Sequence, residues 1–160
     1  MTTLALLPAP LKRLFIRVDV AASNPLLESA LEHWVHRRGR RLFPQTGNLQ
    51  LAELGEVTAH LFILSQREPP SSDWEFVSIG GAASAILLAE GEWPTLNKLG
   101  NRRAAVHLRR LVDLIKETGE PVAAKFAQRT GRQDHFELFM APLSSDGRHI
   151  DGALGGIVRD

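Results

Sequence analysis

Apolar and polar positions alternate most regularly near the C-terminal end of the chain. Phe136, Leu138 and Met140 take every second position, a period of two that is typical of a strand with one face on a core. The dipeptide Asp146-Gly147 follows and suits the positive φ of a tight hairpin turn. Residues 150–158 are rich in small side chains and predict the returning strand. We therefore expect a β-hairpin at this end.

Two segments show the helical period instead. The first opens at Asn24-Pro25, a capping side chain before a proline, and is expected to end at Gly39. The second begins near Asn101 and is expected to end at Gly119. The positions that recur on one side are Leu26, Leu27, Ala30, Leu31, Trp34 and Val35 in the first, and Ala104, Ala105, Leu108, Leu111, Val112 and Ile115 in the second.

The remaining elements complete an α+β pattern. Strands are predicted at 61–64 and 74–79, a short helix at 82–90, and a further strand from Val122. The order is helix, two strands, short helices, a long helix and three strands. It predicts a five-stranded antiparallel sheet with helices packed on one face, plus an N-terminal helix. The alternation from Leu14 to Val20 favours one more strand, within a segment (1–22) that we treat as an extension of a single domain spanning 23–160.

The composition of the chain excludes several kinds of site. The chain has 160 residues, no cysteine and a net charge of +1, which excludes a disulfide framework, a thiolate zinc site and a global field for nucleic acid. The apolar run at 1–7 is too short for a membrane span. We expect a cytoplasmic protein that binds neither nucleic acid nor membrane.

A resemblance to a known family adds to this pattern. The element order is that of PAS domains, and several residues resemble a group of bacterial single-domain PAS-like proteins over about residues 26–158. The residues that carry the resemblance are Trp34, Arg37 to Arg41, Pro44, Pro142-Leu143-Ser144, Asp146-Gly147 and Asp151. The resemblance implies a sensory or regulatory module that acts through a protein partner of a signalling pathway or through homodimerisation.

Under this hypothesis a small ligand could bind between the sheet and the long helix. The candidate pocket residues are Phe76, Leu108, Leu111, Phe126, Leu138 and Met140, and the candidate rim residues are Trp93 and His107. The same six residues are expected in the core even if no cavity exists. The cofactor is unknown: the absence of cysteine excludes the covalent flavin photochemistry of light-sensing PAS relatives, while haem and noncovalent flavin are neither excluded nor indicated.

Two other functions remain open. One is a ligand-free interaction module that docks through the N-terminal helix or through segment 1–22, whose alternating part could add to a sheet edge. The other is a small pocket enzyme of the ketosteroid-isomerase kind, which needs an Asp or Tyr inside an apolar cavity. Because the chain has no tyrosine and shows no acidic residue on an apolar strand face, we predict no enzyme.

The charged clusters have competing interpretations. The run Arg37 to Arg41 could contact phosphates, but a solvated helix end is favoured in a chain of such low net charge. A second basic strip consists of Arg102, Arg103, Arg109 and Arg110 on the long helix. We interpret it as the outer face of that helix, with binding of an acidic partner as the alternative. His33 and His36 have metal-ligand spacing without a third ligand, so no metal site is predicted.

Two clusters near the C-terminus imitate functional motifs. Ser144, Ser145, Asp146 and His149 contain the residue types of a nucleophilic triad, but they fall at a predicted turn, where Ser, Asp and Gly serve the turn itself. The glycines at 152, 155 and 156 lie within a strand and do not open a helix, so they do not form a phosphate loop. We expect them to allow close approach of another element to the sheet.

Overall fold

One antiparallel sheet organises the chain. The computed structural model describes residues 17–19, 22–67, 73–92, 94–130 and 132–159. Within these ranges the strands lie in the order β1-β4-β5-β6-β2-β3. Their bounds are β1 Arg17–Asp19, β2 Leu61–Gln66, β3 Trp74–Ile79, β4 Val122–Thr130, β5 Arg132–Leu143 and β6 Gly152–Arg159.

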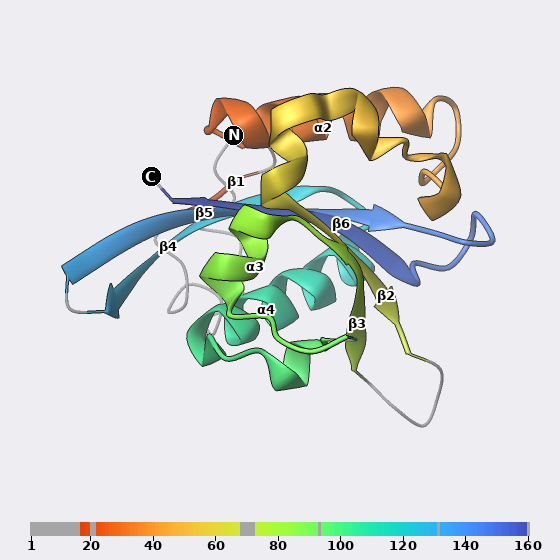
Figure 1. Ribbon diagram of the computed structural model, residues 1–160. Helices are drawn as coiled ribbons and strands as arrows, with labels where there is room; N and C mark the ends of the chain where they lie inside the picture. Colours follow the sequence, from red (N-terminus) through yellow and green to blue (C-terminus); the bar gives the residue numbers. More distant parts are fainter. Residues whose placement is uncertain (1–16, 20–21, 68–72, 93, 131, 160) are drawn as a thin grey trace.

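Helices cover both faces of this sheet (Figure 1). The α-helices are α2 Pro25–Arg38, α3 Gly81–Leu87 and α4 Arg102–Thr118, and the 3-10 helices are η2 Thr46–Asn48, η3 Leu51–His60 and η4 Leu96–Lys98. α2 packs on one face and encloses a core with η3, whereas α3 and α4 enclose a larger core on the other face. None of the helices in the described ranges is long and apolar enough to cross a membrane.

The sequence assigned the N-terminal helix to no face of the sheet, and the structure places it, as α2, on the face opposite α3 and α4. The alternation in β5 predicted that only the register of Phe136 is buried. The other register is buried as well, because Glu137, Phe139 and Ala141 are each no more than 2% exposed. A strand buried on both sides loses the contrast between its two registers, so alternation alone could not reveal the second core.

All five strands of the predicted sheet are present, and β1 joins the same sheet as a sixth strand. β1 pairs antiparallel with β4 and places Val18 opposite Ala124. β1 lies inside segment 1–22, which we expected to be an extension of the domain. It is the described part of the strand predicted from Leu14 to Val20. Both end residues of that prediction lie outside the described residues.

Both major helices begin and end as predicted. The side chain of Asn24 accepts a hydrogen bond from the backbone N–H of Leu26 at 2.9 Å, and Gly39 ends α2 with a φ of 57°. Asn101 caps α4 in the same way, and Gly119 ends it with a φ of 70°. Val35 differs from expectation: it is 46% exposed, because α2 rests on the sheet through a narrower stripe centred on its buried residues, Leu27, Ala30 and Trp34.

The connection between β5 and β6 is longer than the tight turn expected. The strands end at Leu143 and restart at Gly152, which leaves an eight-residue loop. Gly147 does adopt a positive φ, 80°, as its sequence context predicts. The Asp146 carboxylate accepts hydrogen bonds from the backbone N–H groups of Arg148 and His149, both at 2.8 Å. The dipeptide specifies a local turn, but the ends of the strands depend on their pairing with neighbours.

Candidate functional site

The six predicted pocket residues meet in the core between α4 and the sheet. Phe76 comes from β3, Leu108 and Leu111 from α4, and the others from β4 and β5. All six belong to one apolar cluster, and each is at most 3% exposed. Three pockets along the described residues are lined by other side chains. A ligand in this core remains a prediction.

His107 lies inside this core and not at its boundary. It is 3% exposed, and its ring packs against Phe126 with 4.3 Å between centroids. Phe126 in turn stacks on Phe136 at 5.3 Å. Burial, together with the charge of Arg103, lowers the pKa of His107 to about 4, so the imidazole is neutral at pH 7. The other rim candidate, Trp93, lies outside the described residues.

An amide pair links the start of α4 to the sheet. Asn101 and Gln128 exchange two hydrogen bonds, each 3.2 Å long, and the Asn101 amide also donates to the carbonyl of Ile86 at 2.9 Å. Gln128 follows Phe126 by two positions on β4, so both side chains share the face that packs on α4. The sequence marked Asn101 only as the start of a helix and gave no signal for its partner.

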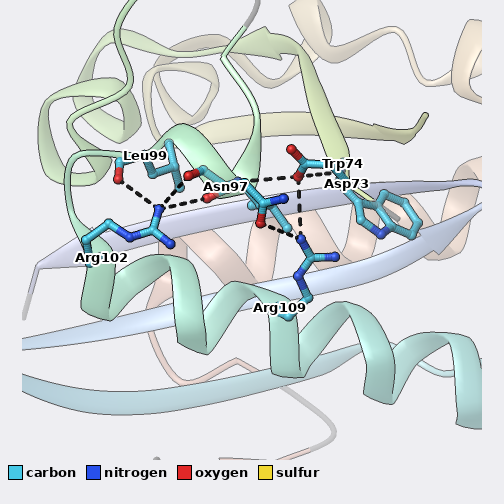
Figure 2. A network of polar contacts seen from close by, with 7 residues as sticks. Asp73, Trp74, Asn97, Leu99, Arg102 and Arg109 are labelled. Carbon is cyan, nitrogen blue, oxygen red and sulfur yellow. Dashed lines mark hydrogen bonds and ion pairs between the residues drawn. The ribbon is translucent and has the colours of Figure 1, made fainter. Parts of the chain in front are cut away.

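A second polar network fixes α4 to the start of β3, the strand at the edge of the sheet opposite β1 (Figure 2). Asp73 is 7% exposed, and its carboxylate accepts from the backbone N–H groups of Trp74 at 2.8 Å and Asn97 at 3.3 Å. The guanidinium of Arg109 donates to the same carboxylate at 3.4 Å and to the Asn97 side chain at 3.0 Å. The start of β3, η4 and the middle of α4 are thereby joined through one carboxylate.

Arg102 completes the attachment of η4 to α4. Its guanidinium donates to the carbonyls of Leu96, Asn97 and Leu99 at 3.4, 2.9 and 3.3 Å (Figure 2). Two arginines of the predicted outer basic strip, Arg102 and Arg109, therefore stabilise the fold itself. Arg103 and Arg110 are exposed, as Arg102 also is, whereas Arg109 is half-buried. A shallow groove of about 280 Å³ beside α4 is lined by Leu96, Asn97, Arg102, Ala105, Val106, Arg109 and Arg110.

The first basic run surrounds the C-terminal end of α2. A pocket of about 400 Å³ there is lined by Arg37, Arg38, Gly39, Arg40, Arg41, Asn48 and Gln50. Near it, the ring of His33 contacts the carbonyl of Leu49, and His36 is exposed. No group of three His, Asp or Glu side chains able to hold a metal ion occurs in the part of the chain that the structure describes.

The Ser, Asp and His residues of the β5–β6 loop bind one another without forming a nucleophile–base pair. The Asp146 carboxylate lies between them and contacts the Ser144 hydroxyl at 3.0 Å and the His149 ring at 2.8 Å. Hydrogen bonds from the His149 backbone and ring, then from Arg148 N–H and the Ser144 hydroxyl, hold the pKa of Asp146 well below its usual range. Ser144 is fully buried, and its hydroxyl also accepts from Gly147 N–H at 2.8 Å. These contacts stabilise the loop.

The glycines of β6 do allow close approach. A Cβ added at Gly155 would lie 2.2 Å from the Phe62 ring, and one added at Gly156 would lie 2.8 Å from Leu27 of α2. Successive residues of a strand point to opposite faces, so this pair of glycines admits a bulky neighbour on each side of the sheet.

The sequence missed one buried acid on a strand face. Glu137 of β5 is 2% exposed, and its carboxylate contacts Ser23 and Asn24 at the start of α2. The statement that no acidic residue lies on an apolar strand face is therefore wrong. The carboxylate is engaged by donors of the protein itself and faces α2, away from the core that contains His107.

Chemically, the α4 core offers apolar rings, a neutral imidazole and an amide pair. No protein-family model matches the chain, and no curated protein and no solved structure is detectably similar to it.

Proposed function

We propose that the chain is a PAS-like regulatory module in which a small ligand alters the packing of α4 on the sheet. The change is transmitted to a protein partner or to a second copy of the chain. The order of elements supports this assignment, since a helix is followed by a strand pair, short helices, a long helix and three antiparallel strands. This is the order on which the resemblance to PAS-like proteins rests.

One observation carries the proposal: α4 is packed on the sheet on one side and tied to surface elements on the other. Its buried residues face the sheet, and Arg109 joins it to Asp73 at the start of β3. A ligand that displaces α4 would therefore alter the contacts of η4 and of the exposed groove beside it. This is how occupancy of a core could change a binding surface.

The end of the core near His107 is the most suitable place for the ligand. Aromatic rings of Phe126 and Phe136 supply apolar contact, while the imidazole and the Asn101–Gln128 pair supply polar groups. Binding sites for small molecules combine a mostly apolar lining with a few such polar groups. A ligand at this end would contact both α4 and β4.

A ligand-free interaction module is the second candidate, and the closure of the core favours it. With all six predicted pocket residues at most 3% exposed, the core can be filled by its own side chains. Under this alternative only the outer surfaces carry function.

Mass spectrometry separates the two candidates. The freshly purified protein is weighed under native conditions and again after denaturation. We expect a mass excess that disappears on denaturation, and an absorbance spectrum would then help to classify the ligand. A native mass equal to that of the chain alone would contradict the ligand-binding proposal and leave the interaction module.

A pair of over-packing variants tests the location. Leu111→Phe adds volume to the α4 core, and Leu154→Phe adds the same volume to the α2 core, with both leucines fully buried. In a filled core such a change lowers the free energy of unfolding by about 1–3 kcal/mol. We expect Leu111→Phe to lose the retained mass at a smaller cost in stability than Leu154→Phe. Equal destabilisation with equal retention would contradict a ligand beside α4.

A further inference from the structure

We propose that the pocket at the C-terminal end of α2 binds a small oligophosphate, an anion with two or more linked phosphate groups. The pocket has a volume of about 400 Å³, and its lining contains four arginines and no carboxylate. It lies at the end of α2, which packs on the other face of the sheet from α4. The inference therefore goes beyond the proposed ligand in the α4 core.

The two arginines nearest the helix are held in place by the protein. The guanidinium of Arg37 donates to Gln50 at 2.8 Å and to the carboxylate of Glu53 at 2.7 Å. That of Arg38 lies over the ring of Trp34, 5.0 Å from its centroid. Trp34 is anchored in turn by a hydrogen bond of 2.9 Å to the carbonyl of Pro142. An anion would thus meet guanidiniums whose positions are already restricted, which lowers the entropic cost of binding.

These guanidiniums also retain donor capacity. The Nε–H groups of Arg37 and Arg38 are buried and have no hydrogen-bond partner within the described residues. A buried donor without a partner destabilises the folded state, because it has lost its hydrogen bond to water. An anion in the pocket that these two arginines line would supply an acceptor for their N–H groups, and the planar fork of arginine suits the oxygens of phosphate.

The charge balance favours an anion with more than one charge. Arg40 and Arg41 are exposed on the turn that follows Gly39, whose φ is 57°. Of the four guanidiniums, that of Arg37 is paired with the carboxylate of Glu53, and the three others carry a positive charge each. The C-terminal end of the helix dipole offsets about half a charge. A single carboxylate would leave most of this charge uncompensated, whereas a linked pair of phosphates would not.

The surroundings favour a small ligand over a nucleic acid. Trp34 lies beneath Arg38 and is 1% exposed, so it cannot stack on a base. The chain as a whole has a net charge of only +1, which gives no extended field for a polyanion. The arginine groove beside α4 is a weaker candidate, since Arg102 and Arg109 are already bound to carbonyls and to Asp73.

Titration with sodium tripolyphosphate tests the proposal, by calorimetry and by amide chemical shifts at 150 mM salt. The variant Arg40→Gln/Arg41→Gln removes two exposed guanidiniums of the pocket. The matched control, Arg103→Gln/Arg110→Gln, removes two exposed guanidiniums of α4. We expect saturable binding by the natural chain, at least tenfold weaker binding by the pocket variant, and a change below twofold in the control. Shifts should concentrate at residues 37–50.

Three outcomes would overturn the proposal. One is the absence of saturable binding up to millimolar tripolyphosphate, and another is equal weakening by both double variants, which would indicate net charge alone. Adenosine triphosphate distinguishes the source of the phosphates: equal affinity supports recognition of the phosphate chain, whereas binding of the nucleotide without tripolyphosphate would contradict it. The native-mass measurement on the α4 core is independent, so either proposal can fail alone.

Discussion

At the scale of single residues, Glu137 joins the sheet to a helix far away in the sequence. Its carboxylate accepts from Asn24 N–H at 2.7 Å, from the Ser23 hydroxyl at 2.7 Å and from Ser23 N–H at 3.2 Å. These donors lie at the N-terminus of α2, where the helix dipole favours a negative charge. One buried carboxylate thus satisfies the N–H of the N-cap residue Asn24, which has no partner within the helix, and two donors of Ser23, and it fixes α2 on β5.

Removing this carboxylate should destabilise the protein strongly. We expect Glu137→Ala to lower the free energy of unfolding by about 2–4 kcal/mol, because three charge-assisted hydrogen bonds are lost in a buried setting. Glu137→Gln should lower it less, since one acceptor oxygen remains. Urea unfolding measures both. Glu28→Ala, an exposed acid in the first turn of α2, is the control, and the interpretation is wrong if it costs as much as Glu137→Ala.

At the scale of elements, β6 is the strand on which the two cores meet. It lies between β5 and β2, and its residues from Gly152 to Val158 are all buried. Gly155 accommodates the ring of Phe62 on one face, and Gly156 accommodates Leu27 and Leu61 on the other. The small residues of this strand are therefore a requirement of packing on two sides.

A single methyl group in β6 should disturb this packing. Gly155→Ala would place its Cβ 2.2 Å from Phe62, whose side chain is fully buried. We expect a loss of about 1–3 kcal/mol in unfolding free energy, as over-packed cores show. Gly81→Ala is the matched control, because a Cβ there meets nothing within 4 Å. Thermal unfolding of both variants tests the argument, and equal transition temperatures would refute it.

At the scale of the whole molecule, the buried His107 makes folding depend on pH. Its pKa falls from 6.5 to about 4 on folding, first through burial and then through Arg103. Between these values the unfolded chain binds a proton that the folded chain does not. Stability therefore decreases as the pH falls from about 6.5 to about 4, and is fully present above 6.5.

The contribution of His107 can be isolated by mutation. Between pH 7.5 and pH 5 it should amount to about 2 kcal/mol, from the two pKa values and 1.36 kcal/mol per unit. We expect urea unfolding of His107→Gln to show a pH dependence smaller by this amount. His36→Gln, at an exposed position of α2, should keep the dependence of the natural chain. If the unfolding free energy of His107→Gln depends on pH as strongly as that of the natural chain, His107 is not the source of the pH dependence.

The sequence by itself determined the local elements of this protein. It predicted β3 at its observed bounds, Trp74–Ile79, and both major helices with their caps, because capping, helical period and strand alternation depend on neighbours a few residues away. It also predicted that the six candidate pocket residues lie in one core, because the periodicity of each element indicates which of its faces is buried.

The tertiary structure decided everything that depends on contacts between distant segments. The second core, the burial of His107 and the eight-residue loop between β5 and β6 arise from the pairing of strands and from the helices above them. Glu137 is the sharpest case: alternation places it opposite the core side of β5, and only the position of Asn24, 113 residues earlier, makes that site a buried helix cap. A polar residue acquires its role from the partner that the fold brings to it, and sequence spacing does not encode that partner.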